Sequence, residues 1–170
     1  MAINLMDTVM DQLKGPVLEQ IGGWIGETPE KTKAAADGIV PSLLSKLIDL
    51  VAKPDGEEKL SEVFNKTDDS ILGKVGSVLK GGKAESVAKA GGSLLTTLFR
   101  DNLVTDTLSG IGKIAGLGSG SAKALLGFLV PIVFGAVKRL VTSKGLSLSW
   151  LIKLMLSQKD SIAKALPKLA

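Results

Sequence analysis

Two reactive residue types are missing from this chain. Its 170 residues include no cysteine and no histidine. Without cysteine no disulfide can hold the fold, and the chain tolerates either redox environment. Without both residues, the usual zinc sites, cysteine–histidine pairs and the serine–histidine–aspartate arrangement are excluded. We therefore expect a protein that is not an enzyme, that binds no cofactor and that needs no metal.

Aromatic residues and long apolar runs are also scarce. Aromatic residues make up 4% of the chain and tyrosine is absent, whereas 45% of the residues are hydrophobic. Strands favour aromatic and β-branched side chains, so this mixture favours helices. The longest uncharged apolar run is Ala124–Val137, which as a helix reaches about 21 Å, short of the roughly 30 Å of membrane hydrocarbon. Because Pro131 also interrupts this run, we expect a buried core helix there.

An internal duplication is the clearest positive feature of the sequence. Residues 5–51 align without a gap with residues 95–141, and 13 of the 47 paired positions are identical. Many other pairs keep only their apolar character, so a packing pattern recurs and not a set of reactive groups. Such an offset indicates a repeated structural unit. The sequence therefore predicts an all-α, compact multihelical bundle built from two copies.

We expect a single helical domain over residues 1–170. Repeat one covers about 3–80, a glycine-flanked linker about 81–92, and repeat two about 93–157. A basic C-terminal helix covers about 147–168. Each copy has too few amphipathic helices to bury its apolar stripes alone, so the two repeats should share one core.

Four matched positions are expected to be structural. Pro41 and Pro131 should occupy equivalent bends that face the interior, because proline inside a helix is costly and its recurrence suggests a requirement of shape. Gly26 and Gly116 precede the two long helices. The segment that follows Gly116 resembles a phosphate-cradling loop, but it lacks the terminal Gly-Lys-Ser/Thr of the P-loop. We interpret it as a flexible connector.

Positive charge is concentrated at the C-terminal end of the chain. Residues 144–170 hold five lysines and one aspartate, while the other 143 residues hold 16 basic and 16 acidic side chains. A lysine-bearing helix with an apolar stripe is typical of a segment that lies on a membrane or in a partner's groove. A terminal helix packed on the core, with its lysines in water, would show the same pattern. The candidate contact residues are Trp150, Lys153, Lys159, Lys164 and Lys168.

Several stretches of the chain resemble a known family. They are Asn4–Asp7, Gly38–Leu44, Asp69–Gly73 and Leu125–Val133, all of which carry glycine, proline or aliphatic residues in a particular combination. Together they resemble the bacterial YidB-like family, a domain of unknown function (DUF937). The closing stretch from Ser157 to Pro167 is similar to versions of this module that precede an OmpA-like envelope domain. The resemblance implies a multihelical fold and gives no residue a catalytic role.

Two functions from different classes remain open at this stage. The first is a scaffold or adaptor that binds a protein partner. The second is a membrane-active or exported protein that meets an anionic surface through the apolar helix and the basic tail. Nucleic acid is not expected, because the chain has only Arg100 and Arg139 as arginines and no interleaved aromatic residues. The amino terminus lacks a basic start followed by an apolar run, so we expect a cytoplasmic protein, with envelope or exported association as the alternative.

Overall fold

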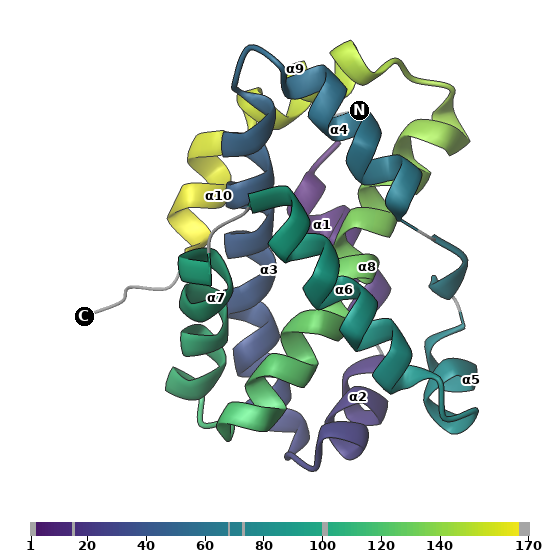
Figure 1. The fold of residues 1–170 in the computed structure, drawn as a ribbon, viewed down its shortest axis with the longest axis vertical. Coiled ribbons are helices and arrows are strands. Elements are labelled where there is room, and N and C mark those ends of the chain that lie inside the picture. Colours follow the sequence, from purple (N-terminus) through teal and green to yellow (C-terminus); the bar gives the residue numbers. More distant parts are fainter. Residues whose placement is uncertain (1–2, 15, 68, 73, 100–101, 167–170) are drawn as a thin grey trace.

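The structure is a computed structural model that describes residues 3–14, 16–67, 69–72, 74–99 and 102–166. Within this part of the chain there are ten α-helices, two short 3-10 turns and no strand, which confirms the all-α prediction (Figure 1). The helices are α1 (Leu5–Met10), α2 (Val17–Ile25), α3 (Pro29–Val51), α4 (Gly56–Lys66), α5 (Val75–Lys80), α6 (Ala84–Phe99), α7 (Asn102–Ile114), α8 (Ser119–Lys144), α9 (Leu148–Ser157) and α10 (Lys159–Ala165), with η1 (Asp11–Leu13) and η2 (Asp69–Ile71) as the turns.

Two long helices, α3 and α8, form the centre of the molecule. Thr28 begins α3 by accepting a hydrogen bond from the Lys31 amide at 3.2 Å, with Pro29 at the first helical position. The helix α8 ends at Gly145, whose φ of +61° suits glycine. Helices α6 and α7 pack on α8, while α2, α7 and α10 pack on α3. Because neighbours cover both long helices, apolar residues occur around most of the α8 circumference.

Helices α6 and α8 cross each other closely, with glycine on both sides. A Cβ atom on Gly91 would lie 1.9 Å from the Gly127 carbonyl oxygen, and one on Gly127 would lie 2.3 Å from the Ala88 carbonyl oxygen. Pro131 has no amide hydrogen to donate to the Gly127 carbonyl one turn earlier. The Gly91 backbone therefore packs directly against a carbonyl that the helix itself leaves without its usual donor.

Side chains from both halves of the sequence join one buried cluster. Leu5, Ile39 and Leu60 belong to it, as do Leu95 and Phe128. The expected linker over residues 81–92 is wrong for most of its length, because α6 begins at Ala84 and continues through both glycines of the pair at 91 and 92. The pair marks a helix crossing instead of a flexible connection.

The two halves share some features at the ninety-residue offset and differ in others. The helices α3 and α8 begin at residues 29 and 119, and each contains its proline. A Cβ on Gly22 would meet Thr32, and one on Gly112 would meet Ala122, so α2 crosses α3 and α7 crosses α8 at matched positions. In contrast, the helices at the start of the two repeated stretches differ in length, because α1 has 6 residues and α6 has 16. The duplication stays a prediction from the sequence.

The two prolines lie inside continuous helices but in different surroundings. Pro41 is buried, as expected. Pro131 is half-buried: its ring lies against α6 at Gly91 and also lines a surface groove, so its surroundings differ from those of Pro41. Pro131 does not end the apolar helix, since α8 runs for 26 residues, well beyond the run Ala124–Val137.

The length argument against a membrane span therefore fails for α8. By length and composition this helix is able to cross a membrane, yet 78% of its most apolar window is buried inside the protein. Its side chains, among them Phe128 and Phe134, fill the core. In this fold α8 acts as a core helix.

Candidate interaction surfaces

The C-terminal segment forms two short helices that pack on the core. Ser147 begins α9 by accepting a hydrogen bond from the Trp150 amide at 3.1 Å. Most of the expected apolar stripe is used internally, since Leu151, Met155 and the Ile162 side chain of α10 are buried. Trp150 remains 38% exposed and Leu156 41% exposed. The single basic helix expected over about 147–168 is thus two helices with a partly apolar outer surface.

The candidate lysines differ in their surroundings. Lys153 and Lys164 are exposed and form no ion pair within the described residues. Lys159 is also exposed but lies 3.9 Å from the Asp49 carboxylate of α3. Lys168 lies outside the described residues. The positive charge available on this surface is therefore smaller than the lysine count of the sequence indicates.

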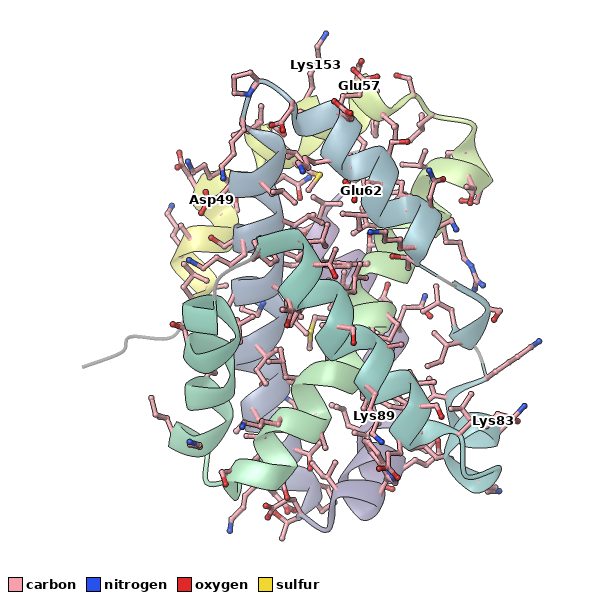
Figure 2. The ribbon with its side chains drawn as sticks, in the orientation of Figure 1. Asp49, Glu57, Glu62, Lys83, Lys89 and Lys153 are labelled. Atoms are coloured by element: carbon pink, nitrogen blue, oxygen red, sulfur yellow. The ribbon has the colours of Figure 1, made fainter. Side chains whose placement is uncertain are left out.

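Acidic side chains of α4 lie beside this surface. The helix α4 packs on α9, and the Ser149 hydroxyl donates to the Glu57 carboxylate at 3.3 Å. Figure 2 shows Lys153 and Glu57 at the same end of the molecule, with Glu62 further along α4. Neighbouring charges of opposite sign shorten the range over which lysines attract an anionic surface.

Gln158, between α9 and α10, anchors the start of the chain. Its side-chain carbonyl accepts a hydrogen bond from the Leu5 amide at 2.8 Å, and its amide group donates to the Ile3 carbonyl. Asn4 caps α1 by accepting from the Asp7 amide at 3.0 Å. The sequence analysis did not find this role of Gln158, because no local pattern pairs residues so far apart.

The loops before the two long helices meet each other. Gly26 and Gly116 both have positive φ, at 76° and 103°. The Glu27 carboxylate accepts a hydrogen bond from the Gly118 amide at 3.0 Å, at the start of α8, and the Ser121 hydroxyl donates to the Ile25 carbonyl at 2.9 Å. A carboxylate of the protein therefore occupies the helix terminus that a phosphate would use. The segment after Gly116 is a structural junction between the halves.

A groove with lysines at its edge lies between α6 and the segment from η2 to α5. Its volume is about 430 Å³, within the usual range of small-ligand pockets. Sequence reasoning missed it, since Pro131 of α8 completes walls that come from the end of α4, η2, α5 and α6. The described residues that line it are Lys66, Thr67, Ser70, Ile71, Lys74, Val78, Lys83, Ser86, Val87, Ala90, Gly91, Leu94 and Pro131.

Shifted pKa values occur away from both surfaces. A hydrogen bond from Lys14 to Asp11 raises the pKa of that lysine, and one from Lys33 to Asp37 raises the pKa of Lys33. Both pairs are exposed, and each joins residues one helical turn apart in the chain. Among the described residues no group of three or more acidic side chains could hold a metal ion.

Comparison with known families shows to which family this chain belongs. The family described as "Bacterial protein of unknown function (DUF937)" matches residues 7–139. The chain belongs to this family. The match covers the elements from the middle of α1 to most of α8, so it includes the groove and ends before α9 of this DUF937 protein. No protein with a curated description and no solved structure matches the chain.

Proposed function

We propose that this DUF937 protein is a non-catalytic helical scaffold or adaptor that binds a protein partner through the outer face of α9 and α10. The observation that carries the proposal is the exposure of Trp150 on a helix whose other side is buried. Tryptophan is enriched at the energetic centres of protein interfaces. Exposed Lys153 and Lys164 add positive charge, so the partner surface should be acidic.

A photo-crosslinking residue placed at Lys153 tests this role in bacterial cells that express the chain. We expect a discrete adduct with one protein, lost when Trp150→Ala is added. The matched control carries the crosslinker at Lys89, which is exposed on α6 and lies toward the opposite end of the molecule (Figure 2). The same adducts from both positions, or none from Lys153, would contradict the proposal.

The second candidate function is contact with an anionic membrane through the same basic surface. A lysine close to an anionic surface contributes about 1 kcal/mol, and this attraction fades over roughly 8 Å at physiological salt. The pairing of Lys159 with Asp49 and the acidic side chains of α4 reduce the expected attraction. For this reason we place the protein partner first.

Co-sedimentation with vesicles of anionic phospholipid separates the two functions. If the membrane role holds, Gln substitutions at Lys153, Lys159, Lys164 and Lys168 abolish binding at low salt. Gln substitutions at Lys33, Lys89, Lys113 and Lys123 remove the same charge from elsewhere and should leave it. A wild-type protein that ignores these vesicles at low salt rules the membrane role out. Binding that survives the first set and high salt would implicate insertion of α8.

A further inference from the structure

We propose that the groove between α6 and the η2–α5 segment binds a single-chain anionic amphiphile, an acyl chain that ends in a carboxylate or a phosphate. This site shares no residue with the α9–α10 face, and its ligand differs from the partner proposed above. Lys83 lies near the α5–α6 end of the molecule and Lys153 at the opposite end (Figure 2). The two proposals therefore stand or fall separately.

The floor and walls of the groove suit an acyl chain. Ile71 comes from η2, Val78 from α5, Val87 and Leu94 from α6, and the Pro131 ring from α8. Gly91 also lines the groove, and its lack of a side chain lets α6 approach α8 so closely that Pro131 forms part of the floor. Apolar surface that a ligand removes from water contributes about 25 cal/mol per Å² before the costs of binding.

Three lysines, and no acidic residue among the described ones, line the edge of the groove. Lys66 pairs with Glu62 at 3.2 Å, whereas Lys74 and Lys83 form no ion pair in the described part of the chain. These two lysines stand just before α5 and α6, on either side of the α5 helix. An anionic head group between them would gain charge-assisted hydrogen bonds while its chain stays on the apolar floor.

A further cation stabilises one wall of the groove. The Lys138 ammonium group of α8 donates to the Thr67 carbonyl at 2.8 Å, and the Thr67 hydroxyl donates to the Val63 carbonyl at 2.7 Å. This contact ties the start of the η2 segment to the central helix. It also adds positive charge beside the groove, which again favours an anion.

Two other hollows of similar size within the described part of the chain lack this combination. One of about 460 Å³ has Asp11 beside Lys14 and Lys80, and one of about 490 Å³ has Glu58 and Glu62 beside Lys66. Carboxylates in these hollows would repel an anionic head group. The groove against Pro131 joins an apolar floor to lysines at its edge, and its described lining residues include no carboxylate.

Calorimetric titration of the full chain with four ligands of equal chain length tests the proposal. The probes are dodecanoate, dodecyl phosphate and dodecyltrimethylammonium, each below its critical micelle concentration, and dodecanol below its solubility limit. We expect the anions to bind about fivefold more tightly than the alcohol at low salt, and the cation more weakly than the alcohol. The stronger of the two anions identifies the head group. The preference should shrink in high salt.

Two variants locate the site. Lys74→Gln with Lys83→Gln should bring the anions to the affinity of the alcohol, while Lys89→Gln with Lys113→Gln should keep the preference. Ala90→Trp, at an exposed helical position on the groove, should weaken all binding at least tenfold by filling the space. Far-ultraviolet circular dichroism checks that each variant is folded, and Ser86→Trp replaces Ala90→Trp if that variant is not.

Several results would overturn the proposal. These are absence of binding by either anion, equal affinity for the cationic amphiphile, or binding that a folded groove-filling variant leaves unchanged. Binding of an acidic, leucine-containing decapeptide with no binding of the amphiphiles would make the groove a peptide site and would equally reject our inference. None of these outcomes bears on crosslinking from Lys153.

Discussion

At the scale of single residues, this fold depends on positions where a side chain is absent. Two glycines adjacent in the sequence show the difference. Gly91 has no room for a Cβ, because the Gly127 carbonyl oxygen would lie 1.9 Å away, while a Cβ on Gly92 would meet nothing within 4 Å. Both lie in the middle of α6, where glycine is a poor helix former. Their opposite environments predict opposite effects of the same substitution.

Gly91→Ala should destabilise the protein by about 2 kcal/mol or more, because the α6–α8 crossing must open. Gly92→Ala should stabilise it by about 0.5–1 kcal/mol, the helix-propensity difference between the two residues. Urea denaturation followed by circular dichroism measures both. Equal effects of the two substitutions would show that α6 does not cross α8 as closely as described.

Glu27 provides a second test at this scale. Glu27→Ala should cost about 1 kcal/mol, because the Gly118 amide at the start of α8 loses its acceptor and the helix dipole loses a favourable charge. Glu27→Gln keeps an acceptor and should cost less. Thermal melting of the two variants gives the comparison, and identical losses would place the role of Glu27 in its charge alone.

At the scale of elements, α9 shows how one amphipathic pattern serves two purposes. Leu151 and Met155 are buried against the core, whereas Trp150 is 38% exposed. This periodicity alone does not distinguish a helix that packs on its own protein from a helix that binds a membrane. In this structure α9 packs on α3 and α4 of its own protein. Trp150 and Leu156 then form the outer apolar surface of the helix.

Leu151→Ala should therefore cost about 3 kcal/mol of stability, since it leaves a cavity in the core. Trp150→Ala should cost less than about 1 kcal/mol and leave the melting transition cooperative, because its ring is partly in water. Differential scanning calorimetry measures both. A Trp150→Ala variant as unstable as Leu151→Ala would make Trp150 a core residue and remove the main support for the adaptor role.

At the scale of the whole molecule, the two halves of the chain are joined through the buried central helices α3 and α8. Helix α8 contacts α1, α2 and α3 of the first half as well as α6 and α7, and α10 returns to α3. Gln158 and Glu27 add hydrogen bonds between the halves. Separating the halves would expose the apolar surface of α8 and the facing side of α3 to water.

We expect residues 1–82 and 83–170, expressed separately, to lack cooperative melting, while the full chain melts in one transition. Amide dispersion in ¹H–¹⁵N spectra and thermal circular dichroism check this. Two halves with well-dispersed spectra and sharp transitions would show two independent domains.

The sequence by itself determined the fold class, the start of the first long helix and the family of this protein. Thr28 and Pro29 are enough to begin α3, because caps and proline act within one turn of the chain. The scarcity of aromatic residues in a hydrophobic chain favoured helices, and the combination of short motifs pointed to DUF937. These signals are compositional or local, so they can be interpreted before any tertiary contact is known.

Only the tertiary structure decided what those helices face. The glycines at 91 and 92 were expected to belong to a linker, but the α8 backbone packs directly against Gly91. The half-buried ring of Pro131 lies against Gly91 and also lines a groove, and the Lys159 charge is paired with Asp49. Burial, close backbone approach and charge pairing depend on residues far apart in the chain, and no local pattern carries that information.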